Sequence, residues 1–219
     1  MILRTLRALI IVSVMALLSV SASANEQAGI VEKMRGTAST LSGGNTIALS
    51  EGAAIHVGDV VMTSDNARLR ILFQDKSTLV MGEKAQMVID ELIYVPAGRE
   101  PEHGEQSLKF VKGVFQFVSG KIAHSDTRQV ALNTPVATIG IRGTRLLTGE
   151  LQVGMPPGNP HYGFQILEGA IDIIAPLGTV TLKNPGEGTF LPLDRVIAPR
   201  PPRQWTKEEA AEAAAAVAF

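Results

Sequence analysis

Cysteine is absent from this 219-residue chain, which excludes a disulfide framework and every mechanism that needs a thiolate. Aromatic residues make up only 5% of the sequence and include a single tryptophan, so an aliphatic core must hold the fold together. Glycine and proline are frequent, with 21 and 12 residues. Valine, isoleucine and leucine supply most of the apolar content, and this combination predicts many short strands separated by turns.

A strong charge of either sign is also lacking. The 20 lysines and arginines are balanced by 21 aspartates and glutamates, which gives a formal net charge of −1. Proteins that bind nucleic acid usually carry a basic stripe or patch, and the sequence shows no such footprint. We therefore expect no nucleic-acid partner.

Long apolar runs are missing except at the start of the chain. Arg4 and Arg7 precede an uncharged apolar run, residues 8–20, which ends in the small residues 21–24. This run is shorter than the roughly 20 residues that cross a bilayer, and the Ala-x-Ala ending is typical of a signal-peptidase site. The pattern predicts a cleavable signal peptide at residues 1–24, with an uncleaved anchor as the alternative, and no transmembrane segment after cleavage.

Metal-binding patterns are weak. His103 and Glu105 are two residues apart, as are His124 and Asp126, and in a strand this spacing places both side chains on one face. Each pair lacks a third ligand, whereas catalytic zinc is held by three protein side chains. We expect no metal site.

Catalytic motifs are missing as well, since the chain has no Gly-x-Ser-x-Gly elbow and no glycine-rich phosphate loop that leads into a helix. Asp75, Asp90 and Glu91 are the acids that could pair across a cleft, as in glycoside hydrolases, whose carboxyl groups stand about 5 to 9.5 Å apart. A glycan hydrolase of the envelope is therefore the enzymatic alternative. The prediction is a protein that is not an enzyme and uses no cofactor.

Alternating apolar residues predict strands between frequent turns. In residues 67–73, Leu69 and Ile71 fall on one face and Arg68 and Arg70 on the other, as expected for a strand with a buried and a largely wet side. Residues 78–81 are its predicted hairpin partner, and Asp75 closes the loop through its side chain. Residues 98–106 and 151–162 are predicted to be exposed loops.

A short pattern recurs along the chain: an apolar residue, a charged residue, glycine, and then a small or β-branched residue that opens a strand. Its spacing is irregular, so a solenoid of fixed period is not supported, and a repeated mode of strand entry is the better interpretation. The pattern occurs at residues 34–37, 111–114, 141–144 and 167–170.

The segment NTPVATIGIRGT, residues 133–144, combines several backbone constraints. Pro135 holds Thr134 extended and fits the first residue of a strand or an edge, whereas Gly143 indicates a bulge or a sharp bend. Arg142 stands between apolar Ile141 and Gly143, so we predict that its guanidinium is partly buried and clamps carbonyls or an acid. A ligand carboxylate or phosphate as its partner is the alternative.

Four blocks, residues 57–63 (VGDVVMT), 67–77 (ARLRILFQDKS), 133–137 (NTPVA) and 141–144 (IRGT), resemble the FecR domain family. The family's pattern runs Gly-Asp-x-Ile-x-Thr, then an alternating strand into Asp-Gly-Ser, and later Thr-Pro-x-Ala-x-x-x-x-Arg-Gly-Thr. Lys76 stands where the family usually has glycine, which argues against a turn with positive φ there. The resemblance implies structural roles for Gly58, Asp59, Asp75, Ser77, Thr134, Pro135, Arg142, Gly143 and Thr144.

The resemblance also implies an all-β periplasmic domain. The best-known members carry a signal from an outer-membrane siderophore receptor to a cytoplasmic sigma factor, and they also have a cytoplasmic anti-sigma region and a transmembrane helix. Neither is expected in this sequence, which resembles the exported stand-alone form of the family.

We predict an all-β fold, a two-layer β-sandwich or short β-roll of many short strands over residues 25–198. A Pro-rich linker and an Ala-rich helical tail follow at residues 199–219, where Thr206 and Glu209 form a capping box. The tail has little apolar bulk with which to dock, so its helix is expected to fray in solution.

The predicted function is that of a non-enzymatic periplasmic binding or scaffolding module with a protein or an envelope polymer as its partner. An accessory of transmembrane signalling in the iron or envelope-stress response is the second hypothesis.

Overall fold

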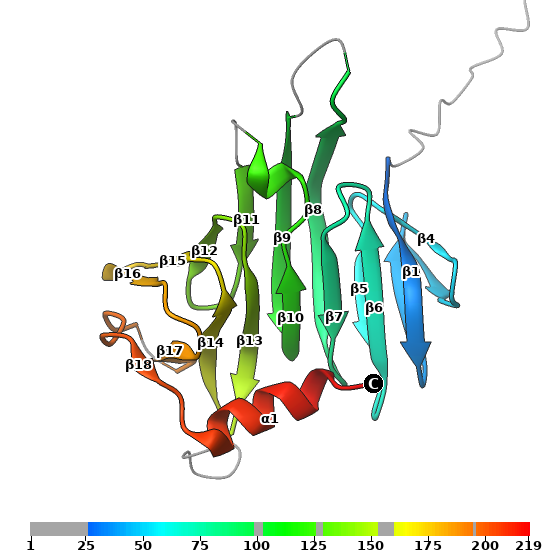
Figure 1. Cartoon of the computed structure of the whole chain (residues 1–219). Helices are drawn as coiled ribbons and strands as arrows, with labels where there is room; N and C mark the ends of the chain where they lie inside the picture. The colour runs from blue at the N-terminus through cyan, green and yellow to red at the C-terminus, as the bar shows by residue number, and fades with distance from the viewer. Residues whose placement is uncertain (1–25, 99–102, 126–128, 153–159, 195) are drawn as a thin grey trace, which may run out of the picture.

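Two β-sheets packed face to face form the body of the protein, and one α-helix crosses the outside of one sheet (Figure 1). This computed structural model describes residues 26–98, 103–125, 129–152, 160–194 and 196–219. The predicted signal peptide lies outside these residues. The all-β prediction is confirmed, and of its two forms the chain adopts the sandwich.

The first sheet, sheet A, has nine strands, and the helix α1 (Lys207–Val217) lies on its outer face. Two very short strands close its edges, which limits the unpaired backbone that an edge exposes. In spatial order the strands are β18 (Arg203–Gln204), β17 (Glu187–Pro192), β14 (His161–Glu168), β13 (Arg145–Leu151), β10 (Val114–Val118), β7 (Thr78–Met81), β6 (Arg68–Phe73), β1 (Gln27–Arg35) and β4 (Ala54–His56).

The second sheet, sheet B, also has nine strands. All its neighbouring strands are antiparallel except β9 and β11, which run parallel. In spatial order the strands are β16 (Gly178–Leu182), β15 (Ile171–Ala175), β12 (Thr138–Ile141), β11 (Gln129–Asn133), β9 (His103–Lys112), β8 (Gln86–Val95), β5 (Val60–Thr63), β2 (Ala38–Ser42) and β3 (Asn45–Ala48).

The chain passes repeatedly from one sheet to the other, and left-handed residues make the corners. Most of these connections contain a residue with positive φ, a conformation that glycine adopts without a steric penalty. The recurring sequence pattern marks four such corners, because its glycines all have φ between 67° and 100° and each joins strands of different sheets. These glycines are Gly36, Gly113, Gly143 and Gly169.

The core lies between the sheets and is mainly aliphatic, as the composition predicts. Alternation puts every second residue of a strand inside, and in β6 Leu69, Ile71 and Phe73 are all buried. The few aromatic residues add local packing, since Phe110 and Phe115 stack with their ring centroids 4.2 Å apart.

The predicted hairpin is confirmed, because β6 and β7 pair antiparallel around a turn that Asp75 closes. The expectation for Lys76 is wrong, since its φ is +68°. A left-handed lysine costs about 1–2 kcal/mol, and the side-chain hydrogen bonds of Asp75 on the same turn offset that cost. The long Lys76 side chain meets no obstacle because it is exposed.

Parts of both predicted loops belong to strands. Residues 103–106 belong to β9, where Gln106 is buried and faces the Asp75 turn, so a run without apolar residues still forms a strand. In the second predicted loop, Leu151 is the last residue of β13, and His161 and Tyr162 are the first residues of β14. Residues 99–102 and 153–159, which both predictions include, lie outside the described residues.

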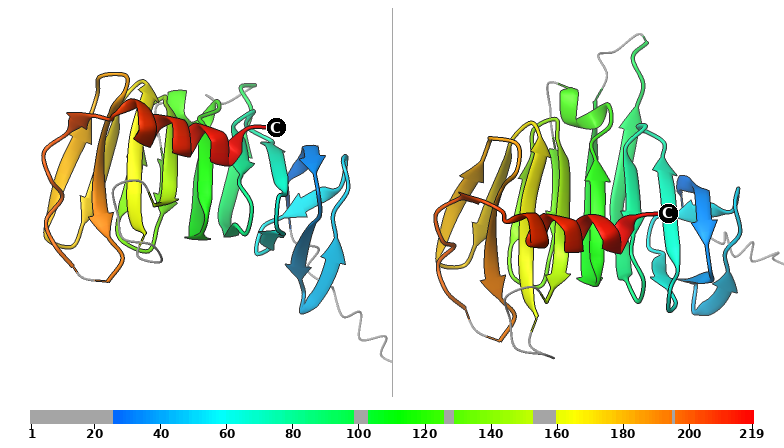
Figure 2. Two further views of the ribbon diagram at one scale, coloured as in Figure 1. Left: turned by 90° about the horizontal axis from the view of Figure 1, so that it is seen from below. Right: turned by 60° about the horizontal axis from the view of Figure 1, so that its bottom comes forward.

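The tail packs against sheet A more extensively than its composition suggests. α1 crosses the strands of this sheet rather than running along them, and Ala213 and Val217 are buried on it (Figure 2). Small alanine side chains allow this close approach. Arg68, predicted on the wet face of its strand, is instead buried there, and its Nη2 donates to the Ala215 carbonyl at 3.3 Å.

Trp205 fixes the beginning of this tail. Trp205 is 8% exposed, and its ring stacks on that of Phe190 with the centroids 4.8 Å apart. It lies directly over Gly188, where an added Cβ would come within 2.0 Å of the indole nitrogen. The predicted capping box is confirmed, since the Glu209 amide donates to Thr206 Oγ1 at 3.2 Å and the Glu209 carboxylate accepts from the Thr206 amide at 2.8 Å.

Candidate functional site

Asp75 and Ser77 form an enclosed polar cluster between the two sheets, and both residues are fully buried. Asp75 Oδ1 accepts hydrogen bonds from the Ser77 amide at 3.0 Å and from Ser77 Oγ at 2.6 Å. Gln106 of β9 donates Nε2 to Ser77 Oγ at 3.1 Å, and the Lys121 amide donates to the Asp75 carbonyl at 2.8 Å. The cluster therefore ties a turn of sheet A to sheet B and to the short 3-10 helix η1 (Ile122–His124).

Gly58 and Asp59 connect β4 of sheet A with β5 of sheet B. Asp59 is fully buried, and its Oδ2 accepts from the His56 amide at 2.9 Å. The Gly58 amide donates to the carbonyl of Ile89 on β8, whose amide in turn donates to the Asp59 carbonyl, at 2.8 and 3.1 Å. These hydrogen bonds fix the connection between β4 and β5 and attach it to β8.

Thr134 and Pro135 form the turn between β11 and β12. Thr134 Oγ1 accepts from the amides of Val136 and Ala137 at 3.3 and 3.0 Å, and it donates to the Ala137 carbonyl at 2.7 Å. Pro135 thus lies in a turn rather than in a strand, and it is exposed. This turn brings Pro135 and Val136 to the surface.

Arg142 is exposed, which overturns the prediction that it is partly buried, although its partner is an acid, one of the two predicted kinds. Its side chain is 68% exposed, and its Nη2 lies 3.0 Å from Asp172 Oδ2. Alternation explains the difference, because Ile141 at the end of β12 is buried and the next residue, Arg142, faces the opposite way. Asp172 lies between buried Ile171 and Ile173 on β15 and therefore also faces the outside of sheet B. Beyond Arg142, Gly143 has a φ of +67°, and the amide of buried Thr144 donates to Ser119 Oγ at 2.7 Å.

The acids of the hydrolase hypothesis do not converge. Asp75 is enclosed between the sheets, whereas Asp90 is exposed on β8. No group of three or more potential metal ligands comes together within the described part of the chain. Asp126, one of the residues considered for a metal, lies outside that part.

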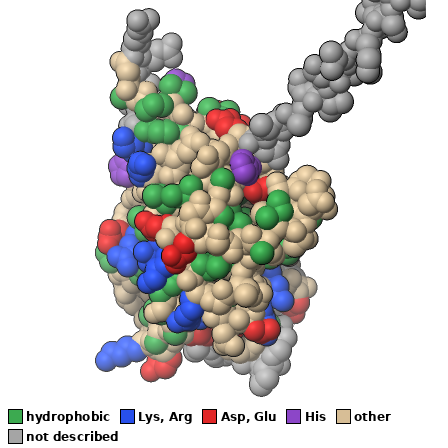
Figure 3. All heavy atoms as spheres, turned by 90° about the vertical axis from the view of Figure 1, so that its right-hand side faces the viewer, with side chains coloured by type: hydrophobic (Ala, Val, Ile, Leu, Met, Phe, Trp, Pro, Cys, Tyr) green, Lys and Arg blue, Asp and Glu red, His purple; other side chains and the backbone are tan. Residues whose placement is uncertain are grey.

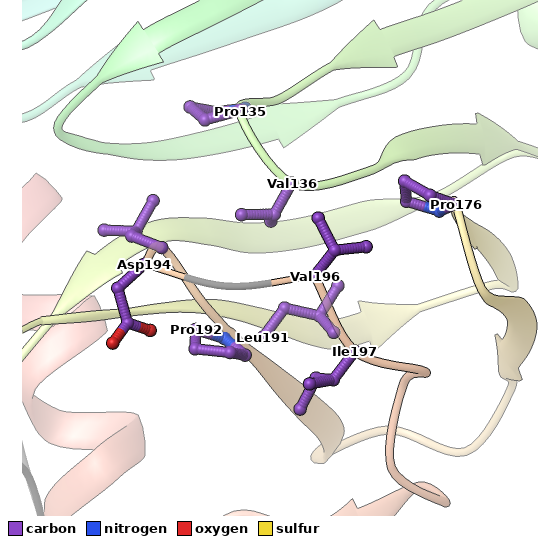
Figure 4. Close-up of a pocket in the computed structure, with 9 residues that line it drawn as sticks. Pro135, Val136, Pro176, Leu191, Pro192, Asp194, Val196 and Ile197 are labelled. Atoms are coloured by element: carbon purple, nitrogen blue, oxygen red, sulfur yellow. The ribbon is translucent and has the colours of Figure 1, made fainter.

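A groove at one end of the sandwich gathers apolar side chains around the Thr134–Pro135 turn. It encloses about 200 Å³ and is built from three segments: this turn, the β15–β16 hairpin, and the end of β17 with the residues that follow it (Figure 4). We call it the Pro135 groove. Its lining includes Pro135, Val136, Pro176, Leu191, Pro192 and Val196, with Asp194 at one edge.

Exposed apolar residues surround this groove. Val196 and Leu193 belong to its lining and are 63% and 37% exposed, and Leu177, next to Pro176, is 60% exposed. At the opposite end, formed by β1, β3 and β4, hydrophobic side chains are scattered among polar ones (Figure 3). The predictions from sequence did not include this groove, although two Pro-Leu pairs, residues 176–177 and 192–193, are a signal for it.

Comparison with known proteins identifies the fold independently. Among curated proteins none matches the chain. Two crystal structures of a "putative anti-sigma factor" from Parabacteroides distasonis ATCC 8503 superpose with TM-scores of 0.51 and 0.50 at 8% sequence identity. In each case the match covers 69% of this chain and 62% of the other.

Among the described residues, no helix has the length and apolar character needed to cross a membrane. The family model described as FecR protein matches residues 59–171, which is more than half of the chain and includes the Asp75 turn, the Thr134–Pro135 turn and the Arg142 corner. The chain therefore belongs to the FecR family.

Proposed function

We propose that this FecR-family chain is a non-enzymatic binding module that engages a partner protein through the Pro135 groove. The observation that carries the proposal is the exposed apolar lining of this groove, in particular Val196. Isolated apolar residues on a surface are ordinary, but a contiguous apolar hollow is typical of an interaction site.

Three prolines make this groove suited to recognition, because their backbone is already restricted before a partner binds. Association then loses little conformational entropy in this part of the module. The hollow is large enough for one aliphatic or aromatic side chain, the kind of anchor that dominates binding energy at protein interfaces. Asp194 at the edge favours a basic neighbour beside that anchor.

The same proposal includes a location and a biological setting. The signal-peptide pattern of residues 1–24 supports export to the periplasm, and membership of the FecR family supports a role in envelope signalling. Deletion of the gene, followed by measurement of iron-responsive and envelope-stress transcripts, tests the signalling role. Unchanged transcripts in both responses would contradict it and leave the binding proposal standing.

Site-specific photocrosslinking tests the groove itself. A photoreactive residue replaces Val196, and the matched control replaces Ile47, which is 51% exposed on β3 at the opposite end of sheet B. We expect a discrete crosslinked protein from position 196 and none from position 47.

The additional substitution Leu193→Asp, in the exposed lining, should abolish the crosslink while the melting temperature is preserved. Crosslinks of equal intensity from both positions, or a crosslink that survives Leu193→Asp, would rule out the Pro135 groove as the binding site.

A further inference from the structure

We propose that a second groove, between α1 and the outer face of sheet A, binds an extended acidic peptide segment of a partner protein. This α1 groove shares no lining residue with the Pro135 groove. It encloses about 470 Å³, within the range of specific ligand sites. The shape of the groove, its basic residues and the buried Gln165 side chain together indicate the chemistry of the ligand.

The walls of the α1 groove are apolar. Val80, Leu147 and Leu167 line it from sheet A. Ala210 and Ala214 line it from α1, and their small side chains leave the space between helix and sheet open. Apolar side chains of a bound segment would be buried between these two surfaces.

The charged residues that line the groove are both basic, Arg70 and Arg145. Arg70 lies 3.8 Å from Glu32 and Arg145 lies 3.5 Å from Glu168, and all four side chains are at least 40% exposed. Such solvent-exposed pairs are weak, so each guanidinium can donate hydrogen bonds to a carboxylate of a ligand. Lys33 and Arg70 also lie 4.6 and 5.2 Å from the centre of the Phe219 ring, which brings a third cation beside the groove.

A buried amide points to a ligand with hydrogen-bond donors. Gln165 lines the groove and is only 3% exposed, and its Oε1 makes no hydrogen bond with any described residue. A buried acceptor without a donor is destabilising, and the backbone N–H of a peptide would satisfy it once the Gln165 side chain turns toward the groove. This need for a donor favours a peptide over a simple anion such as a fatty acid.

Strand register sets the shape and length of the segment. Five lining residues on neighbouring strands are directly opposite one another and form a row across sheet A, so the groove runs across the strands. In order, the row is Arg70, Val80, Gln116, Leu147 and Gln165. Strands lie about 4.8 Å apart, so the arginine strands β6 and β13 are roughly 14 Å apart. Arg145 lies two residues along β13 from Leu147, so the two arginine positions are roughly 16 Å apart. An extended peptide rises about 3.3 Å per residue, so acids at positions i and i+4 lie about 13 Å apart on the same side of the peptide, and the long arginine side chains bridge the remaining distance.

The expected motif of the bound peptide is therefore an acid at position i, an apolar residue at i+2 that packs on the apolar lining from sheet A, and an acid at i+4. Selection from a phage-displayed library of random ten-residue peptides on the purified protein tests this. We expect enriched peptides to carry two acids four residues apart. A consensus without paired acids, or no consensus, would overturn the proposal.

Charge reversal identifies the site. The double variant Arg70→Glu/Arg145→Glu should bind the selected peptides at least about tenfold more weakly and should recover binding to peptides with lysine at both acidic positions. Arg142→Glu, on the outer face of the other sheet, is the matched control and should leave affinity unchanged. Equal weakening by the control, or none by the double variant, would refute the assignment.

Gln165→Leu separates a binding role from a structural one. Removal of an unpaired buried acceptor should raise the melting temperature of the free protein, yet peptide affinity should fall several-fold. A variant that is stabilised and binds as well as the wild type contradicts the role of Gln165. All these measurements use peptides and purified protein, so they are independent of whether a partner occupies the Pro135 groove.

Discussion

Two blocks of the family motif, the Asp75 turn and the Arg142 corner, share a backbone feature but have opposite environments. Each places a charged residue at a reversal of the chain that contains a left-handed residue. Asp75 is fully buried and bonded to neighbours on one turn, whereas the Arg142 side chain is 68% exposed beside a single acid. The position of a turn relative to the two sheets decides its contribution to stability.

Asp75→Ala tests the buried side of this comparison and should have the largest effect. The Ser77 amide and hydroxyl would both lose their acceptor in an enclosed site, which should lower the free energy of unfolding by about 3 kcal/mol. Urea denaturation measures the loss. A decrease below about 1 kcal/mol, comparable to that of an exposed pair, would remove the distinction between the two blocks.

Gly143→Val tests whether backbone geometry matters at the exposed block even though Arg142 contributes little. A β-branched residue is strained at a φ of +67°, and an added Cβ would lie 3.0 Å from His124 Nε2. We expect the free energy of unfolding to fall by about 2 kcal/mol. Gly143→Asn, which tolerates this conformation better, is the control and should lose clearly less.

Glu209 extends the comparison to an ion pair that is buried on one side only, with side-chain exposures of 10% for Glu209 and 50% for Arg203. The two hydrogen bonds from Arg203 hold the pKa of Glu209 below its usual value. Because this pKa is lowered by folding, the stabilisation is present above the unfolded pKa, near 4.3, and is lost as pH falls through the folded value.

Fluorescence of Trp205, the single tryptophan, should report this acid transition of the tail. Glu209→Gln should weaken that transition and cost about 1 kcal/mol at neutral pH, since it also weakens the capping box. A tryptophan signal that is unchanged between pH 6 and 3 would show that the pair does not hold the tail.

Arg142→Ala should have the smallest effect, below about 1 kcal/mol, because the Asp172 carboxylate remains solvated and hydrogen-bonded to Thr181. Thermal unfolding with and without 0.5 M salt, about three times physiological ionic strength, checks this, since salt should reduce the difference further. A loss as large as that of Asp75→Ala would restore the clamp that the sequence suggested.

Local patterns predicted the parts of the fold that depend on backbone chemistry. Alternating apolar residues gave β6 and β7, turn residues gave the Asp75 loop, and Thr206 with Glu209 gave the helix start. The repeated glycine pattern located four corners without showing that each one changes sheets. These features depend on residues close in sequence, so a single sequence reveals them.

The amino-acid sequence by itself determined an all-β chain with an aliphatic core, its main turns and its family. Only the tertiary structure decided that Arg142 is exposed, that α1 covers Arg68 and leaves the groove over Gln165, and that Pro135 meets Pro176 and Leu191 in one hollow. The reason is that burial depends on which distant segments cover a residue, and no local periodicity specifies the pairing of strands far apart in the chain.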